Sequence, residues 1–261
     1  MRKYLLPVYA VAFFTFLLAP VLALTIGSLT EANYVSFPPE GLSLRWYMKI
    51  FAEQESMYAL IMSLGVATAA ATVATAMALP TALALHRYRT PLNKVVYLLV
   101  MTPAMLPAVF LGLAFLLFYS ALGFGGTPLS LVAGHIMIAT PFAVSMNMVG
   151  LASNDGALER AARSLGASPI MAFRKITVPS ISWSLFAGWG FAFMISFGSL
   201  EVSLFLSTST MVTLPVQIYT GLEWSPLDPS LTAVSSGLVI VTLTVLILTA
   251  RFVKIDRFLQ R

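Results

Sequence analysis

Few residues of this 261-residue chain could do chemistry, and the most informative is one acid in an apolar stretch. Glu201 lies in the sequence GSLEVSLF, roughly 27–30 Å along a helix that would begin near Ile181. A carboxylate in an apolar membrane helix is costly and marks a functional site by default. Glu201 is therefore a candidate for a transport path, where it would favour a cationic substrate or hold an outer gate. The alternative is a helix-end acid bonded to Ser199 or Ser203, or to a partner subunit.

Other polar residues in apolar surroundings carry weaker signals. Asn147 favours an interhelical hydrogen bond, and with Ser199 it completes the set of substrate-path candidates. The two histidines, His86 and His135, are too far apart to predict a metal site, and His135 is expected to be a packed polar residue. No catalytic residues and no cofactor are predicted, because the sequence contains no GxxxxGK[ST] phosphate loop, no HExxH, no cysteine and no arguable Ser–His–acid set.

The composition predicts the kind of fold that holds these residues in place. Hydrophobic residues make up 59% of the chain and charged residues 10%, against roughly 25% charged in soluble domains. The chain is therefore predicted to be an all-α integral membrane protein, with residues 1–261 forming a single transmembrane domain. The net charge of +5 does not indicate a nucleic-acid partner, because in a membrane protein the distribution of the charges along the chain is more informative than their total.

Apolar stretches long enough to cross a bilayer number six, since a span needs about 20 residues. The third stretch contains Pro103 and Pro107, and the fourth contains Pro141. The first follows Arg2 and Lys3 and is predicted to be a retained signal anchor, because its apolar run is longer than a signal core. The predicted spans are roughly residues 5–26, 58–85, 95–119, 129–151, 181–206 and 231–252.

The charges predict an orientation. With the N-terminus in the cytoplasm and six alternating spans, 13 of the 15 Lys and Arg residues fall on the inner side. Only Arg45 and Lys49 fall outside, together with six of the ten acids. This is a positive-inside distribution, so both termini and the loop between spans four and five are predicted to be cytoplasmic.

That loop, residues 154–179, is the longest clearly polar interruption in the second half of the chain. It predicts two short helices. Asn154 or Asp155 would cap the first, and Gly166 would end it in a left-handed conformation. Ser168 would cap the second, with Pro169 at its first position. Pro179 would close the second helix and begin the next apolar run.

The 154–179 loop resembles the signature of permease subunits in binding-protein-dependent ABC importers. That signature reads EAA, three residues, Gly, nine residues, then IxLP. Arg160 and Val178 depart from the family's Glu and Leu, and Glu159 supplies an acid one position earlier. Five positions match it residue for residue: Ala161, Ala162, Gly166, Ile176 and Pro179.

The resemblance implies a function that the residues alone do not. The chain would be a non-catalytic permease subunit of the bacterial inner membrane, forming part of a pore. It would form a heterodimer with a second permease chain, and it would work with cytoplasmic ATP-binding subunits and a periplasmic binding protein. It would contact lipid and not nucleic acid. The predicted ATPase-coupling residues are Glu159, Arg160, Ala161, Ala162, Gly166, Ala167, Ser168 and Pro169.

Two looser stretches resemble the spermidine/putrescine type of this family. They are FPPEGLSLRWY in the first outer loop and SFGSLEVSLFL with TLPVQIY after Ser196. Related types carry opines, phosphonates or iron complexes, so the substrate stays open among them. The alternative function is a stand-alone secondary transporter driven by an ion gradient, although the chain shows no visible repeat and only one candidate acid.

Overall fold

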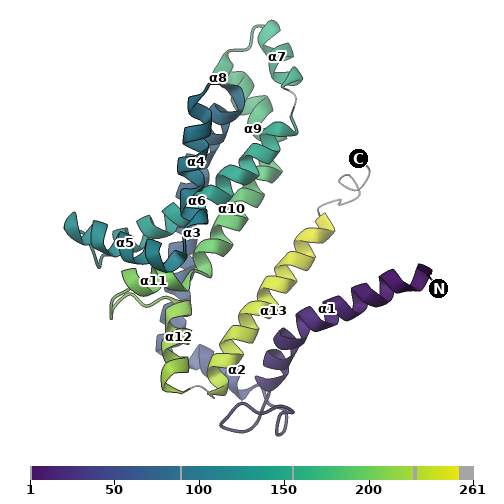
Figure 1. The fold of residues 1–261 in the computed structure, drawn as a ribbon, viewed down its shortest axis with the longest axis vertical. Coiled ribbons are helices and arrows are strands. Elements are labelled where there is room, and N and C mark those ends of the chain that lie inside the picture. Colours follow the sequence, from purple (N-terminus) through teal and green to yellow (C-terminus); the bar gives the residue numbers. More distant parts are fainter. Residues whose placement is uncertain (1, 89, 155, 226–227, 253–261) are drawn as a thin grey trace. The chain divides into compact units, whose positions relative to one another are not determined.

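The computed structural model describes residues 2–88, 90–154, 156–225 and 228–252, and these residues form helices and no strand. The all-α prediction is therefore confirmed. Contacts divide the chain into two compact units (Figure 1). Unit 1 comprises residues 1–57 and 217–261, and unit 2 comprises residues 58–216. Lys254, Arg257 and Arg261, three of the cations assigned to the inner side by the charge count, lie outside the described residues.

Unit 1 is built from α1 (Arg2–Gly27), α2 (Arg45–Ala52), most of α12 (Leu214–Trp224) and α13 (Pro229–Phe252). Hydroxyl groups join three of its segments, because the Tyr47 hydroxyl lies 2.6 Å from both Ser28 Oγ and Ser236 Oγ. The Trp46 side chain is buried and donates its indole N–H to the Thr30 carbonyl at 3.0 Å. These bonds hold α2 against α13 and the end of α1.

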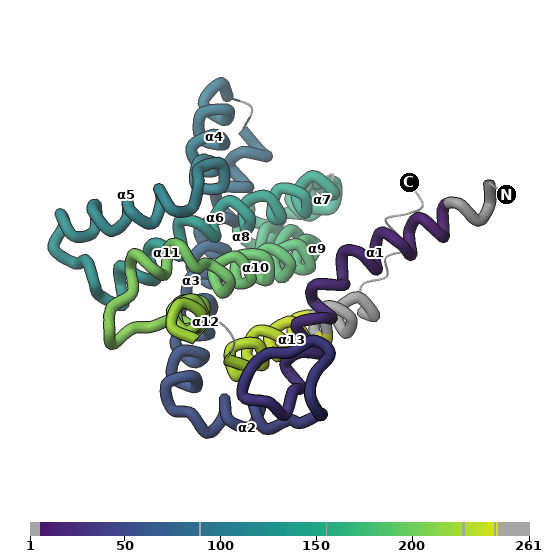
Figure 2. The backbone as a smooth tube through the Cα atoms, turned by 60° about the horizontal axis from the view of Figure 1, so that its bottom comes forward, coloured from purple at the N-terminus to yellow at the C-terminus, as the bar shows by residue number. Residues whose placement is uncertain are grey.

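Unit 2 is organised around α6 (Pro128–Ala152) and α10 (Ser182–Phe197), which run side by side in both backbone views (Figures 1 and 2). Thr127 and Ser130 form a capping box at the start of α6, with Pro128 at its first position. Small residues allow the two helices to approach closely. A Cβ on Gly150 would lie 2.4 Å from the Ser184 Cβ, so the contact requires glycine.

The long helix α3 (Gln54–Arg87) continues through Pro80 and packs its alanines on the same bundle. Its Ala71, Ala74 and Ala78 join Met101 and the alanines of α6 and α10 in one buried cluster. The Trp189 indole of α10 donates to the Thr72 hydroxyl of α3 at 3.1 Å.

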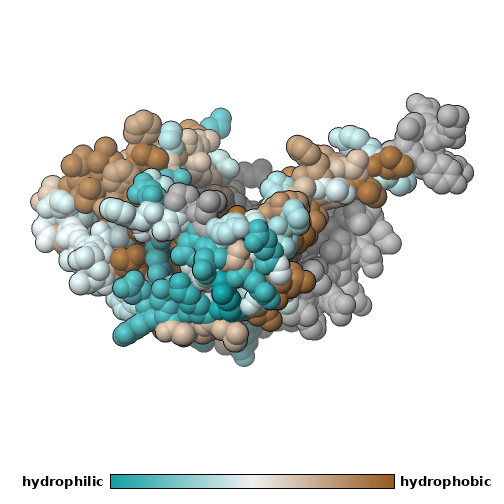
Figure 3. Space-filling model, turned by 90° about the horizontal axis from the view of Figure 1, so that it is seen from below, coloured by the Kyte–Doolittle hydropathy of each residue, from teal (hydrophilic) through white to brown (hydrophobic). Residues whose placement is uncertain are grey.

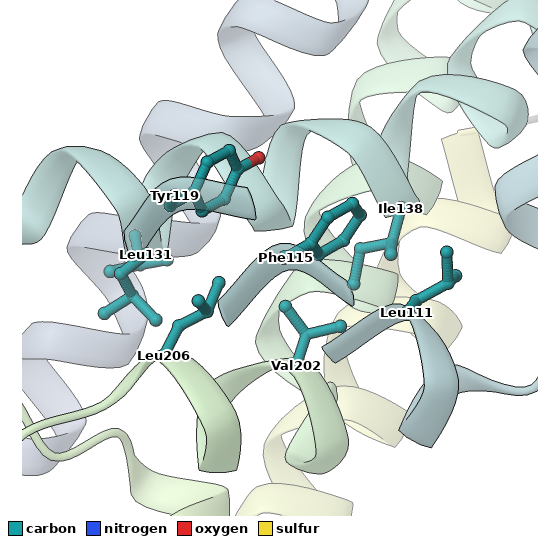
Figure 4. Packing of buried hydrophobic residues seen from close by; sticks show 8 residues of the cluster. Leu111, Phe115, Tyr119, Leu131, Ile138, Val202 and Leu206 are labelled. Atoms are coloured by element: carbon teal, nitrogen blue, oxygen red, sulfur yellow. The ribbon is translucent and has the colours of Figure 1, made fainter. Parts of the chain in front are cut away.

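The predicted third span is wrong as a single helix. The structure has α4 (Leu92–Met105) and α5 (Ala108–Ala121), bent by 104° at the intervening residues. Pro107 has no N–H to donate, and the residue before a proline is driven to extended backbone. Leu106 shows this with φ −88° and ψ 146°. α5 then packs across α6 and α11 (Leu200–Leu206) through apolar side chains, including Phe115, Leu131 and Val202 (Figure 4).

The predicted fifth span is also divided. It is α10, a break at Gly198 and Ser199, and the short α11. By length and composition, three described helices could cross a membrane, and bent pairs raise the number to five. The sixth predicted span coincides with α13, whose apolar stretch Pro229–Thr242 is shorter than a membrane span. The count of six is therefore not reached within the described residues.

Unit 1 carries polar segments. Figure 3 shows hydrophilic residues gathered on the face that is turned toward the viewer. Unit 1 includes the acids Glu31, Glu40, Glu53 and Glu223, which the sequence places in outer loops.

Candidate coupling loop and helix break

The first helix of the 154–179 loop is α7 (Ala157–Ser164), and it starts differently from the prediction. Its N-cap is Gly156, with a left-handed φ of 70°, and no side chain caps it. The Asn154 side chain instead accepts from the Gly156 N–H at 3.1 Å, two residues on, and donates to Ser180 Oγ at 2.8 Å. Asn154 thus forms a local turn and is not the cap, because its short amide reaches the nearer N–H first. Asp155 lies outside the described residues.

The predicted break between the two helices is confirmed. Gly166 has φ 89°, and the Ala167 N–H bonds back to the Ala162 carbonyl at 3.0 Å, as expected of a glycine-terminated helix. Ser168 caps α8 (Pro169–Ala172) by accepting from the Met171 N–H at 3.3 Å, and Pro169 occupies the first position. A side chain at Gly166 would meet no neighbour within 4 Å, so only its backbone conformation requires glycine.

The second helix ends within one residue of the predicted Pro179. α8 runs directly into a π-helical turn, η1 (Phe173–Thr177), and then into α9 (Val178–Ser180). Pro179 therefore lies in the last turn of the helical path, which ends at Ser180. The π turn precedes a proline that cannot donate to the carbonyl one turn earlier. The Ile181 N–H still bonds the Thr177 carbonyl at 3.1 Å, so the path reaches α10 across a 67° bend.

Glu159 anchors the 154–179 loop to the bundle. Its carboxylate oxygens lie 2.6 and 2.7 Å from Nη2 of Arg87, at the end of α3. It also accepts a short hydrogen bond from the buried Thr177 hydroxyl of η1. Only 15% of the Glu159 side chain is exposed, so this predicted coupling residue faces the protein. It ties the first helix of the loop to both the second helix and α3.

The neighbouring predicted coupling residues lie on the other side. Arg160 and Ala161 are exposed, while Ala162 and Ala167 are half-buried. The Arg160 guanidinium lies against Gly156, with Nη1 3.3 Å from where a Cβ on that glycine would stand. The acid and the cation at positions 159 and 160 therefore point to different surroundings, as expected for adjacent helix positions about 100° apart.

Exposed apolar side chains on the loop were missed by the sequence reasoning. Leu165 is 89% exposed, Ile170 is 72% exposed and Leu158 is 66% exposed. Large apolar side chains exposed on a loop that is otherwise polar are candidates for contact with another protein. Their signal was present in the sequence, since each stands among charged or small residues, but the family signature drew attention to the alanines instead. We call Leu158, Leu165 and Ile170 the apolar contact set.

The substrate-path candidates are not brought together as one site. Ser199 is buried at the break before α11, and Glu201 is half-buried in the first turn of α11. Asn147 is fully buried at the α6–α10 contact, with Oδ1 3.2 Å from where a Cβ on Gly188 would stand. Neither amide atom of Asn147 has a hydrogen-bond partner among the described residues.

His135 is packed, as predicted, and it is the best-bonded polar residue of the bundle interior. Its side chain is 1% exposed, with Nδ1 2.8 Å from Ser196 Oγ and Nε2 3.1 Å from Ser203 Oγ. Ser203, which sequence reasoning offered as a partner for Glu201, instead binds His135 and donates to the Ser199 carbonyl at 2.6 Å.

Comparisons with known proteins show the family of the chain. The profile of a family described as "Binding-protein-dependent transport system inner membrane component" matches residues 74–259. The chain is 30% identical over 230 residues to the putrescine transport system permease protein PotI of Escherichia coli (strain K12), covering 85% of this chain and 81% of PotI. It is 28% identical to the spermidine/putrescine transport system permease protein PotC of Haemophilus influenzae, covering 95% of this chain and 96% of PotC.

The fold is similar to that of a solved protein. A crystal structure of a bacterial ABC transporter involved in the import of the acidic polysaccharide alginate aligns with a TM-score of 0.74. The alignment covers 97% of this chain and 96% of that one at 14% sequence identity, so the likeness concerns the fold alone.

Proposed function

Because the chain belongs to the family of inner-membrane components of binding-protein-dependent transport systems and is a permease subunit of an ABC importer, we propose that its 154–179 loop docks on a separate ATPase. Membership of this family excludes the alternative of a stand-alone ion-coupled transporter. Residues 1–261 would act as one permease domain that hydrolyses nothing itself, with a second permease chain, ATP-binding subunits and a periplasmic binding protein as partners.

The apolar contact set is the observation that carries the docking proposal. Leu165 and Ile170 flank Gly166, Ala167 and Ser168, so small residues lie between two exposed apolar anchors. Truncating an anchor in a protein interface typically costs more than about 1 kcal/mol. The predicted coupling residues Arg160, Ala161 and Ala162 would surround these anchors, while Glu159 would fix the loop from behind.

A matched pair of variants tests docking. We expect Leu165→Ala to weaken binding of the ATPase subunits to the purified permease by roughly tenfold, the factor for about 1.4 kcal/mol. Leu122→Ala removes a comparably exposed leucine, 58% exposed, beyond α5, and should leave that affinity unchanged. Affinity is measured by titrating purified ATPase onto permease in nanodiscs. Equal affinities for the two variants would refute docking at the apolar contact set.

Contacts between loops support the predicted orientation. Arg87 and Glu159, both assigned to the cytoplasm by charge, are in contact. At the other end of unit 2, the Tyr58 hydroxyl donates to the Thr210 carbonyl at 2.8 Å. Tyr58 is the outermost residue of the predicted span 58–85, and Thr210 belongs to a loop assigned to the outside. We therefore infer that the 154–179 loop and the N-terminus face the cytoplasm, with the C-terminus on the same side by the charge distribution.

The second permease chain would pack on α3. An exposed face of this helix forms a shallow groove of about 640 Å³ lined by Ile61, Leu64, Gly65, Thr68 and Thr72, among others. Its small residues would let a second helix approach closely. Because the chain contains no cysteine, single cysteines on this face can be cross-linked to the partner without background. No cross-link from Thr68→Cys would contradict this placement.

We propose a small cationic solute of the polyamine class as substrate. Relatives named for putrescine and for spermidine/putrescine transport align over most of the chain. Glu201 and Ser199, beside the helix break, would favour a cation, and Asn147 would offer its unpartnered amide in another state of the bundle. A relative at 26% identity is named for 2-aminoethylphosphonate transport, so that zwitterion is the informative competitor.

Uptake by the reconstituted importer tests the substrate and the path together. We expect ATP-driven uptake of radiolabelled putrescine, competed by spermidine more strongly than by 2-aminoethylphosphonate. Glu201→Gln should raise KM for putrescine severalfold, whereas Glu223→Gln, at an exposed acid of α12, should not. Stronger competition by 2-aminoethylphosphonate would reject the polyamine class. An unchanged KM in Glu201→Gln would remove Glu201 from the path.

A further inference from the structure

His135, which is not among the substrate-path candidates, bridges the break between α10 and α11. α10 ends with the Gly198 N–H bonded to the Met194 carbonyl at 3.0 Å, and Ser199 then takes extended backbone, with ψ 103°. A helix interrupted inside a membrane bundle leaves backbone groups that lipid cannot satisfy. At the N-cap of α11, the Ser199 carbonyl also accepts from the Ser203 hydroxyl at 2.6 Å.

The buried ring of His135 on α6 bonds both sides of the break. Its Nδ1 lies 2.8 Å from Ser196 Oγ, on the last turn of α10, and its Nε2 lies 3.1 Å from Ser203 Oγ of α11. The Ser203 hydroxyl also lies within hydrogen-bond distance of the Ser199 carbonyl, at 2.6 Å. Three polar side chains therefore connect the end of α10, α6 and the start of α11.

α11 packs closely on α5 and α6. A Cβ on Gly134, next to His135, would lie 2.5 Å from Leu206 and 3.2 Å from Val202, so α11 fits where α6 has no side chain. Figure 4 shows Val202 and Leu206 reaching toward Phe115 of α5 and Leu131 of α6. α10, by contrast, continues from the 154–179 loop through hydrogen bonds at Thr177 and Ile181. The two helices thus both pack on α6, and they are joined by the backbone at the break, by Ile195 of α10 in the same apolar cluster, and by the hydrogen bonds of His135.

We propose that His135 is a positioning residue of the transport cycle: it links movement of α10 to α11, and so to Glu201. The inference rests on the proposed role of the 154–179 loop as the ATPase contact. Without the link, α10 would move with the ATPase while α11 stayed seated, and ATP hydrolysis would proceed without a matching displacement at Glu201. The expected consequence is uncoupling, measured as less substrate moved per ATP hydrolysed.

Four variants test the link in the complete importer, reconstituted with its ATPase and binding protein. Ser196→Ala and His135→Gln each remove the bond between Nδ1 and Ser196 Oγ, because glutamine can place a polar atom at the position of Nε2 but has none at the position of Nδ1. Each should lower the transport-to-ATPase ratio about fivefold, the factor for one net hydrogen bond of about 1 kcal/mol. The Ser196→Ala/His135→Gln double variant should be no worse than either single one. Thr140→Val, which removes a hydroxyl of α6 bonded only to its own helix, should keep the wild-type ratio.

A purely structural role gives a different result. It would lower the amount of assembled importer and leave the transport-to-ATPase ratio of the remaining complexes unchanged, which would overturn the proposal. Additive losses in the double variant would also overturn it, because the two changes would then not share one link.

A substrate-independent readout keeps the test decisive if putrescine is not transported. Cysteines introduced at Met194 and Leu204, both exposed, would carry spin labels on α10 and α11 of the otherwise cysteine-free chain. We expect one narrow label distance with and without a non-hydrolysable ATP analogue in wild type and in Thr140→Val. Ser196→Ala and His135→Gln should broaden it. Identical distributions in all variants would refute the link, whereas failed uptake with the expected broadening would reject only the substrate.

Discussion

Gly112 of α5 is the position where one methyl group should report whether α11 is seated as described. An added Cβ would lie 2.6 Å from the Phe205 ring and 2.9 Å from the Glu201 carbonyl oxygen. The ring can turn, but the carbonyl belongs to the backbone of α11 and can move only with the helix. Gly112→Ala therefore has to push α11 away from α5 or distort one of them.

The size of the effect follows from two opposing terms. Overpacking a closely packed interior costs about 1–3 kcal/mol. Replacing glycine by alanine within a helix gains about 1 kcal/mol. Gly190→Ala in α10 should show only the gain, because a Cβ there meets nothing within 4 Å. The difference between the two variants isolates the overpacking term, and it corresponds to about 2–12 °C in Tm at roughly 2–4 °C per kcal/mol.

The assay is thermal unfolding of the purified chain in detergent, with both variants and the wild type measured side by side. Gly112→Ala should melt below Gly190→Ala by that margin. A second readout is the uptake of putrescine, which should fall in Gly112→Ala because Glu201 lies on the displaced turn. Equal melting temperatures for the two alanine variants would refute the close contact between α5 and α11.

Three further perturbations have defined outcomes. Arg87→Gln removes a partly exposed partner of Glu159, so the free energy of unfolding should change by less than about 1 kcal/mol. Hydrogen–deuterium exchange should show faster exchange of the backbone amides in α7. Gly166→Val forces a branched residue to positive φ at a cost of about 1–2 kcal/mol, and should abolish ATP-driven uptake with normal membrane insertion as judged by membrane fractionation. The hydrogen bond and charge of Glu40 raise the pKa of Tyr34, so the stabilisation by this bond is complete below pH 10 and is lost as the pH rises past the raised value. Ultraviolet difference titration should show a lower tyrosine pKa in Glu40→Gln, and no difference would contradict the bond.

Sequence reasoning succeeded where structure is determined locally. Gly166, Ser168 and Pro169 were placed correctly because the end of one helix and the start of the next depend on a few adjacent residues. The start of α7 was placed wrongly for the same kind of reason. Asn154 can cap a helix or close a two-residue turn, and the choice depends on whether Gly156 adopts a left-handed conformation.

Features that depend on distant contacts were beyond the sequence pattern. The sequence shows two prolines in the third span, but the 104° bend at Pro107 also requires an apolar surface on which α5 can pack. α11 supplies part of that surface. His135 was expected to be packed, yet its partners Ser196 and Ser203 are 61 and 68 residues away. Glu159 was assigned to the docking surface, and its bond to Arg87 across 72 residues instead makes it an anchor.

Left-handed glycines flank α7 on both sides, and this has a consequence for how the loop tolerates change. Gly156, with φ 70°, joins α7 to the α6 side, and Gly166, with φ 89°, separates it from α8, after which the helical path runs through η1 and α9 to Ser180. Insertion of one residue next to either glycine would lengthen a connection outside the helices. The same insertion within α8, η1 or α9 would rotate the rest of that helical path by about 100°. Variation in loop length should accordingly accumulate next to Gly156 and Gly166 and be excluded from residues 169–180.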